Sequence, residues 1–205
     1  MAPESCLFTR EVKHIFYLGG DSYPTDAGVE TLIADAFGSF FNLKVVRQSD
    51  LLIGCSDDWR AIPSRVAHLR DHLDGLVGHA LLIGRSSGAR VVSMLANHPS
   101  VGAVICLAYP FQHPYEGVDV ERYKHLPATV TPMMIIQGFN DPYGGEGLVS
   151  KYQLPDSIQV KYVDTNHEMM LAPEAWDEVV ASMMAFSKSA LQLQLPSSHV
   201  TQRPA

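Results

Sequence analysis

The sequence has few cysteines and few charged residues, and each shortage narrows the class of protein. The three cysteines, Cys6, Cys55 and Cys106, follow neither a zinc-site nor a redox spacing, and their odd number argues against a disulfide framework. Charged residues make up only 18% of the chain, and no run of Lys or Arg is longer than two. With a formal net charge of −7, the chain has no general electrostatic attraction for nucleic acid or anionic lipid.

Long apolar segments and targeting signals are also lacking. No apolar run reaches the ~18 residues of a membrane span. The first residues, MAPESCLFTREVKH, do not place a basic region before an apolar stretch, as a secretory signal would. We therefore expect a cytoplasmic monomer or homodimer with no nucleic-acid or membrane partner. The spacing of its residues implies neither a metal nor another cofactor.

Apolar runs alternate with helical patterns along the chain. The runs predict strands at residues 12–18, 43–46, 80–83, 101–108, 133–137 and 158–163. Apolar residues spaced three or four apart, together with helix start and stop signals, predict helices around 29–37, 66–76, 87–97 and 173–191. Strands separated by helices indicate right-handed crossovers and a mainly parallel sheet. Continuously apolar strands such as HALLIG indicate helices on both faces of that sheet, hence an α/β fold.

The domain organisation expected from 205 residues is simple. We predict one domain over residues 1–192 and a mobile tail over 193–205. Residues 109–130, rich in Pro, His and Tyr, are too many for an ordinary strand-to-helix loop. We expect this insertion to form a small cap whose side chains line a substrate pocket, namely Tyr109, Phe111, His113 and Tyr115.

The segment Gly84-Arg85-Ser86-Ser87-Gly88 matches G-x-S-x-G between a buried strand and a helix. This context places a serine on a sharp, strained turn at the carboxyl end of a sheet. Small residues are needed two positions to either side, and Gly84 and Gly88 meet that need. The turn also directs the Ser87 backbone N–H and the helix N-terminus toward the serine hydroxyl. The pattern predicts that Ser86 is a nucleophile.

A serine hydroxyl is a poor nucleophile unless a base accepts its proton. His167 follows the sixth predicted strand and precedes the last helix, so it lies in a loop at the same edge of the sheet. Other histidines begin strands, follow helices or lie in the tail. His68 and His72 are four residues apart on a helix, but no third metal ligand is evident. We expect His167 to be the base.

The base needs a carboxylate that fixes its tautomer. Asp141 follows the fifth predicted strand in QGFNDP, and Pro142 favours an extended conformation at Asp141. Asp164 is a second candidate, although it is close to His167 in sequence. The order Ser86, Asp141, His167 is that of α/β-hydrolases.

The loop after the first strand is expected to supply the second hydrogen-bond donor for an oxyanion. It reads Gly19-Gly20-Asp21, and glycine lets the backbone approach a ligand closely. Gly20 N–H and Asp21 N–H both remain candidates, beside Ser87 N–H. The Asp21 side chain is expected to repel an oxyanion, to bind a cationic substrate group or to point into solvent.

The segments LLIGRSSGAR, AYPFQHP and MMIIQGFNDPYGG resemble a family of small α/β-hydrolases. This family includes the testis-expressed hydrolase-like protein and a subunit of the NSL histone-acetyltransferase complex, and dienelactone hydrolases are more distantly similar. The resemblance covers about residues 12–190. It implies an α/β-hydrolase fold and a triad of Ser86, Asp141 and His167. The chain departs from the family by having Ser87 where Met or Leu is usual after the serine, and Gly19-Gly20 where His-Gly is usual.

The sequence thus predicts a serine hydrolase that cleaves an ester or thioester of a small acyl substrate through an acyl-enzyme. A non-catalytic interaction protein on the same fold is the first alternative, and it predicts a blocked or misaligned triad. A dehalogenase or lyase is disfavoured because such enzymes tend to use Asp or Cys as nucleophile. A phosphate-binding loop is disfavoured because Gly84 to Gly88 lacks its lysine.

Overall fold

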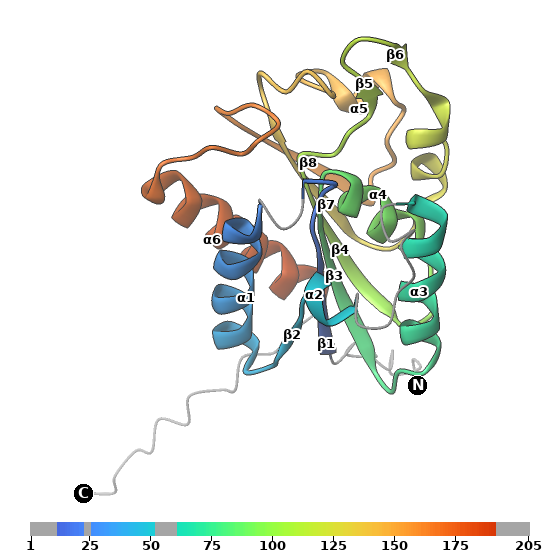
Figure 1. Cartoon of the computed structure of the whole chain (residues 1–205), viewed down its shortest axis with the longest axis vertical. Coiled ribbons are helices and arrows are strands. Elements are labelled where there is room, and N and C mark those ends of the chain that lie inside the picture. The colour runs from blue at the N-terminus through green and yellow to red at the C-terminus, as the bar shows by residue number, and fades with distance from the viewer. Residues whose placement is uncertain (1–11, 23–25, 52–60, 192–205) are drawn as a thin grey trace, which may run out of the picture.

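The computed structural model describes residues 12–22, 26–51 and 61–191, which fold around one parallel sheet (Figure 1). Its strands lie in the order β2-β1-β3-β4-β7-β8, and every neighbouring pair is parallel. The strands are β1 (Val12–Leu18), β2 (Val45–Val46), β3 (His79–Arg85), β4 (Val101–Leu107), β7 (Met133–Gly138) and β8 (Ile158–Val163). The predicted α/β fold with six strands is confirmed. Cys6, Cys55 and the tail predicted at 193–205 lie outside the described residues.

Helices cover both faces of the sheet (Figure 1). Helices α1 (Ala27–Phe41) and α6 (Pro173–Ala190) pack on one face, where Phe37 and Met183 are fully buried. Helices α3 (Ile62–Asp74) and α4 (Ser87–Met94) pack on the other face through residues such as Leu69 and Val92. Two short helices, α2 (Gln48–Leu51) and α5 (Leu148–Lys151), were not anticipated. The two apolar faces explain why strand β4 is buried along its whole length.

Strand β2 is shorter than the sequence predicts, because the exit from helix α1 occupies part of the expected run. Asn42 adopts a left-handed conformation (φ 53°), and Leu43 N–H donates to Gly38 O at 3.2 Å. Only Val45 and Val46 then pair with β1.

The insertion at 109–130 packs differently from the predicted cap. Tyr109 and Phe111 are fully buried in the core, where the Phe111 ring stacks on Tyr152 with centroids 4.6 Å apart. Their apolar rings gain more from this burial than from lining a wet pocket. Tyr115 is 93% exposed, next to the short strands β5 (Gln112–His113) and β6 (Gly117–Val118). The prediction that Tyr109, Phe111 and Tyr115 line the substrate pocket is therefore wrong.

No helix among the described residues is both long enough and apolar enough to cross a membrane.

The turn from β3 to α4 depends on two glycines. Ser86 lies at its apex with φ 52° and ψ −121°, a region that costs a non-glycine residue roughly 1–3 kcal/mol. A Cβ atom on Gly88 would lie 2.2 Å from Leu18 O, and one on Gly84 would lie 2.5 Å from Gly88 O. Helix α4 thus begins against the end of β1 with no room for a side chain between them.

We expect Gly88→Ala to destabilise the fold by more than the ~1 kcal/mol typical of single substitutions, because backbone must move to admit the methyl group. Gly28→Ala is the matched control. Gly28 lies in helix α1 with open space around its Cβ position, so alanine there is expected to stabilise the protein by roughly 0.5–1 kcal/mol. Urea unfolding followed by circular dichroism measures both. Equal unfolding midpoints for the two variants would contradict the steric account of the turn.

Candidate active site

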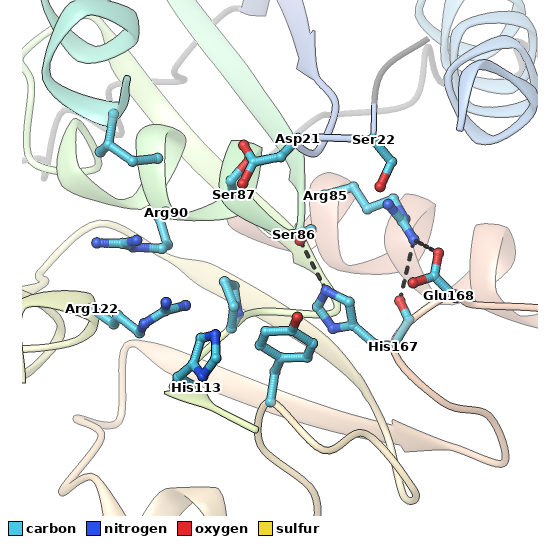
Figure 2. Close-up of a pocket in the computed structure, with 13 residues that line it drawn as sticks. Asp21, Ser22, Arg85, Ser86, Ser87, Arg90, His113, Arg122, His167 and Glu168 are labelled. Atoms are coloured by element: carbon cyan, nitrogen blue, oxygen red, sulfur yellow. Dashed lines mark hydrogen bonds and ion pairs between the residues drawn. The ribbon is translucent and has the colours of Figure 1, made fainter. Parts of the chain in front are cut away.

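Three loops at the carboxyl edge of the sheet bring Ser86, His167 and Asp141 into one line. Ser86 Oγ lies 2.9 Å from His167 Nε2, a contact that Figure 2 marks with a dashed line. His167 Nδ1 lies 3.0 Å from Asp141 Oδ2 and 3.1 Å from Asp141 Oδ1. The three residues follow β3, β8 and β7 respectively, so the parallel sheet itself sets their proximity.

This geometry fixes the proton positions along the line. A carboxylate only accepts hydrogen bonds, so His167 Nδ1 carries the proton and donates it to Asp141. His167 Nε2 is then unprotonated and accepts the Ser86 hydroxyl hydrogen. The ring of Tyr143 covers His167 with centroids 4.1 Å apart. The imidazole is thereby held in the orientation and tautomer that general base catalysis requires.

The Asp141 carboxylate is fully buried and has further donors. Gln137 Nε2 donates to Asp141 Oδ2 at 2.6 Å, and Tyr143 N–H donates to Asp141 Oδ1 at 2.8 Å. Such charge-assisted hydrogen bonds compensate for the loss of water around a buried carboxylate. Asp164, the second candidate, instead accepts from Asn140 Nδ2 at 3.5 Å on the exposed side of the loop.

The backbone donors near Ser86 differ from those predicted at Gly20. Gly20 N–H donates to Asp26 Oδ2 at 3.1 Å, because Arg85 holds that carboxylate beside it. Of the two candidates for the second oxyanion donor, Gly20 N–H is therefore already engaged by a carboxylate. Neither Ser87 N–H nor Asp21 N–H has a hydrogen-bond acceptor within residues 12–22, 26–51 and 61–191.

The side chains of Ser87 and Asp21 belong to a network whose Ser87 and Arg65 are buried and whose Asp21 is exposed. The Ser87 hydroxyl donates to Asp21 Oδ1 at 2.5 Å and accepts from Arg65 Nη1 at 2.9 Å. Arg65 also donates to Gly19 O at 2.7 Å and to Gln48 Oε1 at 3.0 Å, and burial lowers the pKa of its guanidinium. Asp21 is thus held by Arg65 and Ser87. Its side chain is 65% exposed, which agrees with the expectation that it points into solvent, and its contacts with Ser87 and Arg65 also fix the loop after β1.

The buried guanidinium of Arg85 forms a second network on the other side of Ser86. Its guanidinium, only 2% exposed, pairs with Asp26 at 2.8 Å and with Glu168 at 3.0 Å. It also donates to the backbone O of His167 at 3.3 Å. Figure 2 shows Arg85 and Glu168 side by side next to His167. Arg85 therefore ties the His167 loop to the segment that precedes helix α1.

A pocket of about 290 Å³ opens over Ser86. Of the four pocket residues predicted from the insertion, only His113 lines it. Pro110 and Arg122 from the same segment line it as well, together with Arg90 of helix α4. The full lining is Asp21, Ser22, Ile62, Arg85, Ser86, Ser87, Arg90, Pro110, His113, Arg122, Tyr143, His167 and Glu168.

Several of these functional positions had weak signals in the sequence. Gln137 and Tyr143 flank Asp141 within QGFNDPYGG, so their roles as its neighbours follow from that segment. Arg85 occupies a variable position of G-x-S-x-G. Arg65, Arg90 and Arg122 carried no signal, since arginine on a helix or loop is normally solvated.

In the part of the chain that the structure describes, no group of three or more His, Cys, Asp or Glu residues is arranged to hold a metal ion. His68 and His72 stack edge to face with centroids 4.7 Å apart, and their nitrogens bond to backbone carbonyls.

Solved structures with a similar fold include two esterases and the protein named Est1E. A Pyrococcus furiosus esterase aligns with a TM-score of 0.61 at 12% identity, over 86% of this chain and 82% of that one. Est1E from Butyrivibrio proteoclasticus aligns with 0.61 at 11% identity, over 88% and 90%. The esterase domain of a Rhodothermus marinus protein aligns with 0.59 at 15% identity, over 89% and 89%. At these identities the likeness is one of fold alone.

No curated protein matches the sequence. The family model described as "Alpha/beta hydrolase domain" matches residues 55–188, a range that contains Ser86, Asp141 and His167. Because this range is more than half of the chain, and because the sheet order and the strand-to-helix turn agree with it, the protein belongs to the α/β-hydrolase family.

Proposed function

We propose that the protein is a serine hydrolase that cleaves carboxylic esters or thioesters through Ser86, His167 and Asp141. The observation that carries this proposal is the unbroken line of contacts from Ser86 Oγ through the imidazole to a buried carboxylate. A non-catalytic role on the same fold predicts a blocked or misaligned triad. The 2.9 Å contact and the open pocket above it disfavour that alternative.

The reaction begins when Ser86 Oγ attacks the carbonyl carbon and His167 Nε2 accepts the hydroxyl proton. Collapse of the tetrahedral intermediate leaves an acyl-enzyme, and His167 returns the proton to the leaving oxygen or sulfur. A water molecule then attacks the acyl carbon, with His167 again as base. The carboxylic acid departs and Ser86 regains its proton. General base catalysis of this kind contributes typically ~10²–10⁴ in rate.

The oxyanion of the intermediate requires donors that are fixed before the reaction. Ser87 N–H, at the N-terminus of helix α4, is the first. We assign the second to Asp21 N–H, because Gly20 N–H is donated to Asp26. The contacts from Arg65 and Ser87 to the Asp21 side chain hold this loop still. Each such donor contributes about 3 kcal/mol to stabilising the transition state.

The finer family placement is also part of this proposal. The segment Q-G-x-x-D-P-x-G supplies the orienting carboxylate and its two neighbours, Gln137 and Tyr143. These contacts give the residues of this segment a structural role, which is to hold the Asp141 carboxylate in place. They support a place among the small hydrolases that resemble the testis-expressed and NSL-complex proteins.

A fluorophosphonate probe tests whether Ser86 is activated. We expect the native protein to be labelled and to hydrolyse p-nitrophenyl acetate, whereas Ser86→Ala loses labelling and roughly 10⁴-fold or more of the turnover. In-gel fluorescence and nitrophenolate absorbance are the two readouts. An unlabelled native protein with an intact circular dichroism spectrum would overturn the proposal.

Asp141→Asn tests the assignment of the orienting carboxylate. The amide removes the charge that stabilises the imidazolium and presents a donor toward His167 Nδ1, so kcat is expected to fall about 10³–10⁴-fold. Asp164→Asn is the matched control, since Asp164 is exposed and, within the described residues, its carboxylate accepts a hydrogen bond from Asn140 and from no other side chain. Its kcat is expected to stay within about twofold of the native value. If Asp164→Asn were the variant that lost activity, the two carboxylates would have to exchange roles.

A further inference from the structure

Two arginines line the pocket on the side away from His167. Figure 2 shows Arg90 and Arg122 on one side of Ser86, with His167, Arg85 and Glu168 on the other. Arg90 belongs to helix α4 and Arg122 to the 3-10 helix Val120–Arg122 of the insertion. Segments far apart in sequence thus place two guanidinium groups at one wall of the pocket.

Among the described residues, the guanidinium of Arg90 has no hydrogen-bond or ion-pair partner. Arg90 is half-buried, and its Nε atom is buried without an acceptor. Burial and the nearby charge of Arg122 both lower the pKa of the Arg90 guanidinium. A partly desolvated cation beside a like charge is unfavourable unless an anion joins it.

Arg122 is fixed in place and keeps donors for a ligand. Its side chain is 17% exposed, and its Nε donates to Asp119 Oδ2 at 3.1 Å. Its backbone O accepts the Tyr109 hydroxyl at 2.6 Å, which anchors the turn to the core. No acceptor among the described residues engages the two Nη atoms of Arg122.

Asp119 offsets the charge of Arg122, and the other titratable groups of the pocket leave the charge of Arg90 uncompensated. The Asp21 carboxylate is engaged by Ser87 and Arg65, and Glu168 is engaged by Arg85. His113 Nδ1 accepts the N–H of Glu116 at 3.2 Å, so the remaining ring nitrogen of His113 is a further donor. The wall is therefore basic in a chain whose net charge is −7. That overall charge disfavours a polyanionic macromolecule and leaves a small anion as the ligand.

The position of His167 decides which part of the substrate carries the anion. His167 must protonate the leaving group, so the leaving group lies on the His167 side of Ser86. The acyl group then extends toward Arg90 and Arg122. We propose that the substrate is a half-ester or half-thioester of a short dicarboxylic acid, whose free carboxylate binds Arg90 and Arg122. This inference rests on the hydrolase function proposed above and adds its substrate class.

Ser86 is the N-cap of helix α4 and Arg90 lies in the first turn of that helix, so a short acyl group can join the nucleophile to this wall of the pocket. The half-ester of adipate is a probe of that class. In mono-p-nitrophenyl adipate, Ser86 would form the ester bond to the near carboxyl carbon and p-nitrophenol would leave. Water would then release adipate and free Ser86, so the reaction needs no other co-reactant.

The test compares mono-p-nitrophenyl adipate with p-nitrophenyl hexanoate, in which a methyl group replaces the free carboxylate. We expect the native protein to favour the adipate ester about 10–100-fold in kcat/KM, the range of charge-assisted hydrogen bonds. Arg90→Gln and Arg122→Gln are each expected to reduce this preference at least about tenfold. Arg90→Lys keeps the charge and is expected to retain part of the preference.

Arg70→Gln is the matched control, because Arg70 is exposed on helix α3 and lies outside the pocket lining. It removes the same charge and is expected to keep the native preference. Circular dichroism verifies that every variant is folded. Equal kcat/KM for the two esters in a native protein that fluorophosphonate labels would overturn the substrate class while leaving the hydrolase function standing.

A binding measurement separates the two proposals further. In the Ser86→Ala background, monomethyl adipate is expected to raise the Tm, and methyl hexanoate is not. The added Arg90→Gln substitution is expected to abolish the rise. No rise with monomethyl adipate would overturn the anion site, whatever the labelling of Ser86. A rise in a protein that fluorophosphonate fails to label would leave the anion site standing and overturn the hydrolase function.

Discussion

Close approach between backbone segments at two glycines is the constraint on which the site depends. At Gly88, helix α4 begins against the last residue of β1, and at Gly138 the end of β7 meets Thr165 O, which a Cβ atom would approach to 2.3 Å. The first contact raises Ser86 above the sheet edge. The second brings the loop of His167 over the loop of Asp141. The parallel sheet places the three loops at one edge. The two glycines then allow the backbone segments to approach closely enough for the three side chains to make contact.

Local patterns in the sequence were sufficient for the fold and for these three residues. Continuously apolar runs predicted the strands because parallel strands are covered on both sides, and β1 and β8 have the predicted bounds. The serine motif carries its own steric requirement, and the order of nucleophile, acid and base follows the order of strands. The predicted alignment of Ser86, His167 and Asp141 is present in the structure, whereas their catalytic roles stay a prediction.

The rest of the site depends on which distant side chains meet, and no local pattern encodes this. The sequence predicted Tyr109 and Phe111 as cap residues, because their loop is rich in aromatics. In the structure both are buried in the core, where Phe111 packs against Tyr109 and stacks on Tyr152. Gly20 had the right place for an oxyanion donor, but Asp26, six residues later, accepts its N–H. The arginines of the pocket come from segments whose proximity exists only after folding. Charge alone in the sequence could not reveal them, because the chain as a whole is acidic.

The hydroxyl of Ser87 connects Arg65 to Asp21, so a substitution at one of the three residues alters the hydrogen bonds of the other two. Met or Leu at this position would leave the buried guanidinium of Arg65 short of an acceptor and would free Asp21 beside it. Removing one member of a buried charged network is costly, whereas replacing all members together by neutral groups can be nearly neutral. The residue after the nucleophile, the arginine on α3 and the acid after β1 therefore form an epistatic unit. A change at Ser87 is therefore expected to be tolerated only together with changes at Arg65 and Asp21.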